Sequence, residues 1–274
     1  MCCMLRRRRV RQQISLLVPL GGDDPIRARN WAWLERYWRD QLPHAEIVIG
    51  RDRKSQRRWH RRRPLPFSKA VAINNAFKRS RGDVIVLLDS DAYLDAKVVQ
   101  HCAERLRAQR KTGVRSWFVP YDHLYRLTRQ ITKLIVESDP RHPLRLSTPP
   151  PPQDVDGRDG SGPINVFGAM CQIMPREAFI AVGGMDPRFR GWGAEDYAFA
   201  LALDELWGPR HNTPNDILHL WHPSFTGGSG PAWTVKMWAN QTKPGVNNRL
   251  GARYANAIGK PDAMRSLVDE GRKR

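Results

Sequence analysis

The segment Asp83–Leu88 constrains the fold more than any other part of this sequence. After Asp83 it reads Val-Ile-Val-Leu-Leu, an uninterrupted apolar run rich in β-branched side chains. A strand that is apolar throughout, without polar alternation, is typical of a central parallel strand that is buried on both faces. The segment therefore predicts an α/β protein with a mostly parallel central sheet and helices on both of its faces.

Strand and helix patterns alternate along much of the chain, which supports the same fold class. Ser68 and Asn30 are candidate N-caps, and Pro261 suits a first helical turn. Apolar runs predict strands at 14–18, 46–49, 115–120 and 217–222, and amphipathic patterns predict helices at 30–39, 69–78, 95–110, 194–206 and 262–270.

Three regions follow from these patterns. Residues 1–13 form a basic N-terminal tail, 14–228 a single α/β domain, and 229–274 a C-terminal helical extension. The stretch STPPPPQDVDGRDGSGP at 147–163 breaks the alternation with four consecutive prolines followed by glycines. Such a composition predicts a flexible loop inside the domain.

The chain is strongly basic, with 46 Lys and Arg against 27 Asp and Glu in 274 residues and a formal charge of +19. This balance predicts a polyanionic or phosphorylated partner, or an anionic surface. Residues 51–63 alone hold eight basic residues and one acid. The run is either a solvated loop or an anion-binding surface. Trp59 among these arginines supports an alternative function as a nucleic-acid-binding protein.

The compartment is expected to be cytoplasmic. No stretch approaches 18 apolar residues, and the apolar run at 14–20 breaks at Pro19 and Gly21, which argues against a signal peptide. The four cysteines show neither a CxxC pair nor zinc-site spacing, which favours reduced thiols. The alternative is a lipid anchor at Cys2 and Cys3 beside the basic run 6–9, which would attach the protein peripherally to an anionic membrane.

Two carboxylates, Asp89 and Asp91, come directly after the strand at 83–88. Ligands of open α/β sheets bind beyond the carboxyl ends of the strands. Side chains two residues apart in extended chain point the same way, so we expect Asp89 and Asp91 to face one ligand together. Their hard oxygen donors suit Mg²⁺ or Mn²⁺ bridging the pyrophosphate of a nucleotide. The alternative is an Asx turn or helix cap at the end of the strand.

A glycine-rich segment, GWGAED at 191–196, precedes the predicted helix at 194–206. Gly191 and Gly193 permit positive φ and close approach of a ligand. Trp192 between them is expected at a surface or cleft, where its indole would stack on a sugar ring.

Glu195 and Asp196 at the end of this segment occupy the first turn of the helix, where the helix dipole favours their ionised forms. A carboxylate held there would accept the proton of an acceptor hydroxyl. The alternative is the ordinary preference of helices for acids in their first turn.

Two histidines, His219 and His222, lie in the sequence HLWH. On a continuous strand the two positions face opposite sides, so only one would aim at the site unless the strand breaks. A neutral imidazole would complete a mixed Asp/His shell, which favours Mn²⁺ over Mg²⁺. The alternative is a structural role for each histidine.

Together these segments resemble the GT-A glycosyltransferases of family 2, with a C-terminal part similar to the galactosyltransferase-type module. PFSKAVAINNAFKRSRGDVIVLLDSDAYL at 66–94 looks like the stretch in which a helix precedes the DxD strand. GGMDPRFRGWGAEDYAFALAL at 183–203 looks like the acceptor-side motif, and HLWHP at 219–223 resembles the final metal-ligand segment. The resemblance covers roughly residues 14 to 225 and rests on three motifs in the family's order.

For the metal and the catalytic residues, the resemblance implies the following roles. Asp89 and Asp91 match the DxD, with Asp91 as the more direct metal ligand. His222 matches the terminal metal ligand better than His219. Asp196 matches the catalytic base of the Glu-Asp pair, and Glu195 would orient the acceptor.

For the substrates, the resemblance implies a second group of residues. Trp192, between Gly191 and Gly193, would line the acceptor sugar. The residues that match positions near the nucleotide-sugar donor in the family are Pro19, Asp52, Lys69, Asn75 and Asp89. The basic neighbours of Asp52, which are Arg51, Arg53 and Lys54, depart from the acidic pattern that the family has there.

The implied reaction is metal-dependent inverting transfer from a UDP-linked sugar, Gal or GalNAc, to a hydroxyl of a glycan, lipid, protein or nucleic acid. Two competing functions are a metal-dependent nucleotidyltransferase or hydrolase, which also uses carboxylates and a divalent cation, and an inactive, lectin-like relative. The Gly-Trp-Gly-x-Glu-Asp segment argues against the first, and the presence of Asp91, Asp196 and His222 argues against the second.

Overall fold

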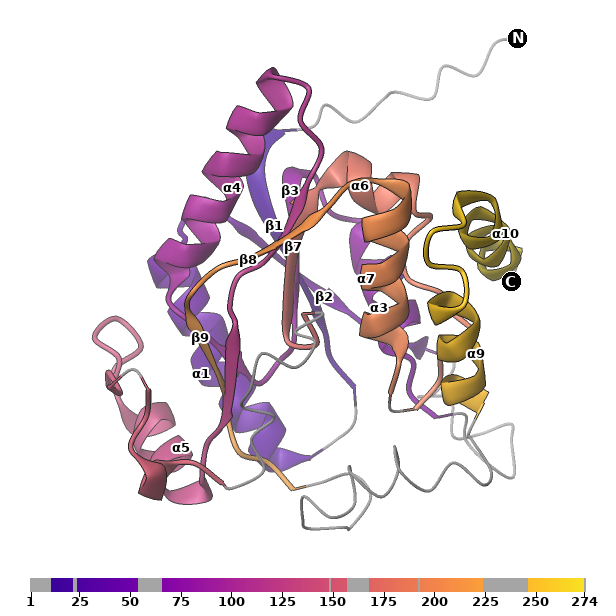
Figure 1. The fold of residues 1–274 in the computed structure, drawn as a ribbon. Coiled ribbons are helices and arrows are strands. Elements are labelled where there is room, and N and C mark those ends of the chain that lie inside the picture. The colour runs from indigo at the N-terminus through magenta and orange to yellow at the C-terminus, as the bar shows by residue number, and fades with distance from the viewer. Residues whose placement is uncertain are drawn as a thin grey trace, which may run out of the picture.

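A mixed six-stranded sheet forms the centre of the molecule (Figure 1). The computed structural model describes residues 11–21, 24–53, 66–147, 149–156, 168–191, 193–223 and 246–273. The sheet has the order β2-β1-β3-β7-β5-β8, with strands β1 (Arg11–Pro19), β2 (Glu46–Gly50), β3 (Gly82–Leu88), β5 (Trp117–Val119), β7 (Cys171–Pro175) and β8 (Arg210–Asn212).

The directions of these strands confirm the α/β class and refine the expected sheet. β1 pairs in parallel with β2 and β3, and β5 pairs in parallel with β8. β7 runs antiparallel between β3 and β5, which makes the sheet mixed. All seven residues of β3 are buried, as the apolar run 84–88 predicts, and buried Asp83 near its start is paired with Arg107.

A second, three-stranded sheet lies beside the carboxyl end of β3. Its order is β4-β9-β6, formed by Ala92–Tyr93, Asp216–His219 and His123–Arg126. β4 follows β3 after only three residues and pairs antiparallel with β9. This sheet therefore brings the end of β9, far along the chain, next to Asp89 and Asp91.

Helices cover both faces of the central sheet. Figure 1 shows α1 and α4 on one side and α3, α6 and α7 on the other. α9 and α10 pack against α7. The helices are α1 (Pro25–Gln41), α3 (Lys69–Phe77), α4 (Ala96–Lys111), α5 (Arg129–Glu137), α6 (Arg176–Ala181), α7 (Glu195–Leu206), α9 (Val246–Ala255) and α10 (Pro261–Arg272).

The start of α1 differs from the sequence prediction. Asp24 is its N-cap, accepting the Arg27 backbone N–H at 2.8 Å, and Pro25 occupies the first turn. Asn30, the expected cap, is buried inside the helix and donates to the Trp221 carbonyl at 2.9 Å. Asp24 as N-cap and Pro25 in the first turn are together sufficient to start a helix, so α1 begins at Pro25 instead of after Asn30.

Two further expectations change at the ends of elements. The strand expected at 217–222 ends at His219. Residues 152–154, inside the expected flexible loop, form a 3-10 turn, and Val155 bridges to Leu127. The expectations for residues 1–10, 54–63, 157–163 and 229–245 lie outside the described residues.

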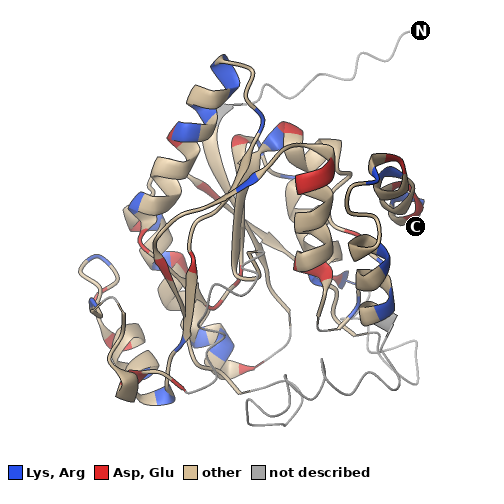
Figure 2. Ribbon diagram, in the orientation of Figure 1, with Lys and Arg blue, Asp and Glu red and all other residues tan. Residues whose placement is uncertain are grey.

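Basic side chains are distributed along several outer helices (Figure 2). α4 alone carries Lys97, Arg105, Arg107, Arg110 and Lys111. Among the described residues, no helix is both long enough and apolar enough to cross a membrane.

Gly50 sets how closely α3 approaches the sheet. A Cβ at this position would lie 2.1 Å from the Ala72 carbonyl oxygen, a backbone atom that cannot move away by itself. We expect Gly50→Ala to lower the free energy of unfolding by about 2 kcal/mol, as overpacked cores do. Urea unfolding followed by circular dichroism measures this change. An unchanged midpoint would show that α3 is not held this closely.

Candidate active site

The carboxyl end of β3 turns sharply instead of continuing as extended chain. The Asp89 backbone N–H donates to the Met170 carbonyl, and the Ala92 N–H donates back to the Asp89 carbonyl at 3.1 Å. This turn separates the two carboxylates of the DxD. Asp89 contacts Lys69 and Asp91 contacts two histidines, while the two carboxylates still interact electrostatically. That they face one ligand together stays a prediction.

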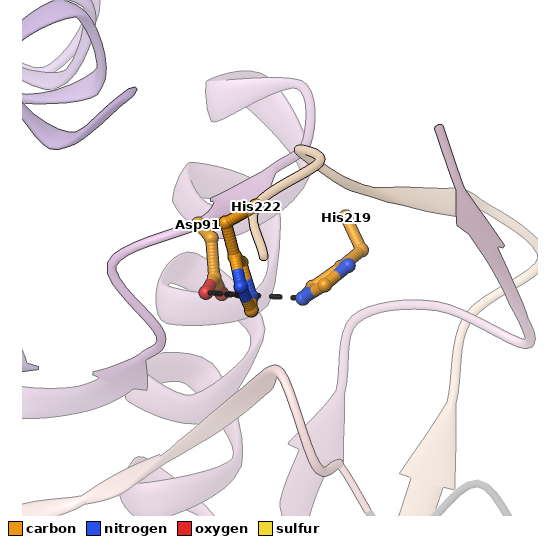
Figure 3. Close-up of side chains that lie close together, drawn as sticks. All are labelled: Asp91, His219 and His222. Carbon is orange, nitrogen blue, oxygen red and sulfur yellow. Dashed lines mark ion pairs between the residues drawn. The ribbon is translucent and has the colours of Figure 1, made fainter. Parts of the chain in front are cut away.

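Asp91 lies against both histidines of the HLWH segment (Figure 3). Its Oδ2 atom is 3.2 Å from His222 Nε2 and 3.8 Å from His219 Nε2. All three side chains are largely buried. Both histidines reach Asp91 because β9 ends at His219, so strand alternation does not continue to His222. The Leu220 N–H donates to the Asp91 carbonyl and keeps this segment beside Asp91.

The protonation states of this cluster suit a metal. Burial lowers the pKa of His219 to about 3, which keeps its imidazole neutral. Nδ1 of His222 donates to the Pro223 carbonyl at 2.8 Å, which leaves Nε2 without a proton and able to act as an acceptor or a ligand. Burial opposes ionisation of Asp91, but its surroundings, the Arg27 guanidinium among them, outweigh burial and hold the pKa of Asp91 below the usual range.

These three residues could therefore hold a divalent cation. Their ligand atoms lie within 4.8 Å of one another and comprise two imidazole nitrogens and one carboxylate oxygen. Such a nitrogen-rich set favours Mn²⁺ over Mg²⁺. Asp89 lies outside this group, so its assignment as a metal ligand stays a prediction.

A second cluster forms around the Lys69 ammonium. Lys69 begins α3, whose N-cap is Ser68 as expected from the sequence. Its Nζ atom lies 2.6 Å from Asp89 Oδ1, 2.9 Å from Asp196 Oδ1 and 2.9 Å from the Ala169 carbonyl. One cation thus joins the end of β3 to the start of α7.

The carboxylates of this cluster resist ionisation. Burial raises the pKa of Asp89 to about 6 and that of Asp196 well above its ordinary value, and Lys69 opposes both shifts. The negative charge of Glu195 adds to the rise. Glu195 Oε2 is buried and finds no hydrogen-bond partner among the described residues. Asp196 is therefore a carboxylate with a raised pKa that two contacts from Lys69 hold in place.

The loop before α7 contains residues with positive φ. Gly191 and Gly193 have positive φ, as expected, and Ala194 is the only non-glycine residue with positive φ in the described chain, at 68°. A left-handed alanine costs free energy and persists only where its surroundings hold it. Gly251 of α9 packs so closely that a Cβ there would lie 2.9 Å from the Ala194 Cβ. Trp192 lies outside the described residues.

The other expected donor residues lie along the same edge of the sheet. Pro19 ends β1 and pairs with Gly50. Asn75 donates to the Arg51 carbonyl at 3.1 Å. Asp52 is fully buried. Its carboxylate accepts a hydrogen bond from the Ser68 backbone N–H and forms an ion pair with Arg190 at 3.1 Å. Their roles in donor binding stay predictions.

Three polar residues near the site were missed by the sequence analysis. Asn74 bonds to both the N–H and the carbonyl of Met185 and fixes the GGMD segment. Asn247 does the same for Arg190, and Arg27 contacts the metal-ligand cluster. Each acts across more than 50 residues of sequence, so no local pattern reveals it. Arg27 alone carries a signal, because a cation in the first turn opposes the helix dipole.

The glycosyl transferase family 2 model matches residues 47–183, which is half of the chain. This match includes α3, β3 and both carboxylates of the DxD. The chain belongs to glycosyl transferase family 2. A second model, described as the N-terminal domain of galactosyltransferase, matches residues 164–205 and includes the Glu-Asp pair of this transferase.

Solved structures give more distant similarity to the transferase. The catalytic domain of Drosophila beta1,4galactosyltransferase 7, in complex with xylobiose, is 16% identical with a TM-score of 0.41, covering 77% of this chain and 71% of that one. Mannosyltransferase PcManGT from Pyrobaculum calidifontis, in complex with GDP-Man and Mn²⁺, is 14% identical with a TM-score of 0.46, covering 95% and 69%. Among curated protein sequences, none matches the transferase.

The metal cluster can be tested by titrating the apo transferase with Mn²⁺ in a calorimeter. We expect Asp91→Asn, His219→Ala and His222→Ala each to weaken binding by about tenfold or more, because each removes one ligand. His211→Ala is the matched control, since His211 lies on β8 outside the cluster and should leave affinity unchanged. Equal affinities across all four variants would contradict the assignment.

Proposed function

We propose that this glycosyltransferase is metal-dependent and inverting, and that Asp196 is its general base. The observation that carries the proposal is the position of Asp196. It begins α7 beside Glu195 and is held by Lys69, which also holds the end of the DxD strand. The proposed base and the proposed metal ligand Asp91 thus lie along one sheet edge.

The metal end of the site suits the departure of a nucleoside diphosphate. Asp91, His219 and His222 are the residues that would hold the cation. When bound, a divalent cation neutralises charge that develops on the leaving diphosphate. The pKa of Asp91 is lowered and burial lowers that of His219, so both side chains favour the deprotonated form that a metal ligand requires.

The base end suits deprotonation of a hydroxyl. A carboxylate with a raised pKa is a better proton acceptor than an ordinary surface aspartate. Burial provides that rise at Asp196, and the two contacts from Lys69 keep the carboxylate in place. A hydroxyl that loses its proton to Asp196 can attack the anomeric carbon opposite the leaving group in a single displacement, without a covalent enzyme intermediate.

The donor we favour is UDP-Gal or UDP-GalNAc. Support comes from the galactosyltransferase model that matches 164–205, together with the resemblance of HLWHP to the final metal-ligand segment. The acceptor is a hydroxyl of a glycan, lipid, protein or nucleic acid, and the basic surface favours an acidic one.

We expect Asp196→Asn to bind the donor normally and to lose transfer by at least about 10²-fold, the contribution typical of a positioned base. Release of UDP, with and without acceptor, measures transfer, and calorimetry measures donor binding. Glu205→Gln, at the other end of α7, is the control. Undiminished turnover in Asp196→Asn would remove the base assignment, and release of UMP instead of UDP would indicate a nucleotidyltransferase or hydrolase.

Lys69→Met should move the pH dependence of kcat/KM. The Lys69 charge opposes the rise in the pKa of Asp196, so removing it raises that pKa further. Activity requires the deprotonated carboxylate, and the acidic limb of the profile should therefore move to higher pH. Lys69→Arg keeps the charge and serves as the control. If the acidic limb of the kcat/KM profile stays in place or moves to lower pH, Lys69 does not control the pKa of Asp196.

A further inference from the structure

Arg27 places a cation directly against the proposed metal ligands. Its Nη2 atom lies 2.8 Å from His222 Nε2, and its Nη1 atom lies 3.6 Å from Asp91 Oδ2. Among the described residues, Asp91 is the only carboxylate within ion-pair distance of Arg27. Arg126, which pairs with His219 between β6 and β9, also acts on the cluster, but Arg27 is the cation in direct contact with Asp91 and His222.

The contact with His222 excludes a metal at that nitrogen. Nδ1 of His222 donates to the Pro223 carbonyl, so Nε2 has a single lone pair and no proton. That lone pair accepts the Arg27 N–H. One lone pair cannot both accept a hydrogen bond and coordinate a cation, so His222 can bind metal only after Arg27 has left it.

Arg27 is able to leave. It lies in the first turn of α1, where the positive end of the helix dipole makes a cation unfavourable. Its side chain is 37% exposed, so the guanidinium can turn towards solvent without disturbing the core. Its attraction to buried Asp91 is what offsets the dipole.

We propose that Arg27 is the resident counter-cation of Asp91 and His222, that it competes with the divalent cation for them, and that the diphosphate of the donor receives it when it is displaced. The inference rests on the proposed metal site. A displaced guanidinium needs another anion, and diphosphate oxygens match its planar fork of donors. Arg27 thereby makes metal binding favourable chiefly when donor is present.

The test is calorimetric titration with Mn²⁺ of the wild type, Arg27→Gln, Arg29→Gln and Asp91→Asn, each checked for folding by circular dichroism. Arg29 is the matched control because it is an exposed arginine on the same helix. Removing the charge at Arg27 should tighten Mn²⁺ binding by about tenfold or more, since like charges this close repel strongly. Arg29→Gln should leave the affinity unchanged.

The outcomes separate this inference from the metal site itself. If Asp91→Asn loses Mn²⁺ but Arg27→Gln binds it no better than Arg29→Gln, the metal site stands and the role of Arg27 is wrong. If Asp91→Asn binds Mn²⁺ as the wild type does, or no variant binds it, the proposed metal site is wrong and the inference fails with it.

A second titration, in saturating UDP, tests the diphosphate part. The ratio of the Mn²⁺ affinity of Arg27→Gln to that of the wild type should shrink several-fold, because the wild-type guanidinium can then pair with the diphosphate of UDP. An advantage of the same size with and without UDP would show that the diphosphate does not receive Arg27.

Discussion

The contact on which the rest of the site depends is the buried ammonium of Lys69 between Asp89 and Asp196. Asp89 ends the central strand β3, and Asp196 begins α7 more than 100 residues later. Without the cation, burial would force these carboxylates to take up protons or move apart. Lys69 instead holds them within one site, and α3 can present it there because Gly50 lets the helix lie close to β2.

The site contains two clusters of charged side chains, one around Lys69 and one around Asp91, and they differ in their ratio of positive to negative groups. Around Lys69, two carboxylates contact one ammonium and Glu195 acts on it electrostatically, and burial raises the pKa values of Asp89 and Asp196. Around Asp91, the Arg27 cation and two imidazoles surround one carboxylate and lower its pKa. The first arrangement favours proton acceptance and the second favours an ionised ligand. The formal charge of +19 conceals both, because most of the excess basic residues lie elsewhere.

Much of the fold could be predicted because local patterns specify it. The apolar run 84–88 of β3 is buried throughout, and Ser68 caps α3 as a serine before an apolar helix should. Asp91, His219 and His222, which form the candidate metal cluster, were also singled out from sequence, but not their arrangement. Asp89 and Asp91 have different partners although their charges interact, and the strand break left open for HLWH does occur, because β9 ends at His219. Arg27, Asn74 and Asn247 were missed because their partners are distant in sequence.

The sequence by itself determined the class of protein. Its buried strand, its order of motifs and its carboxylate and histidine residues identify an α/β transferase of family 2, because hydrophobic periodicity and motif spacing are local properties. Only the tertiary structure decided which charges meet. Asp89 pairs with Lys69, Asp91 gathers both histidines, and Arg27 contacts the metal ligands because the β4-β9-β6 sheet and helices α1, α3 and α7 converge at the end of β3. Electrostatic interactions act through space, and their partners are set by packing rather than by position in the chain.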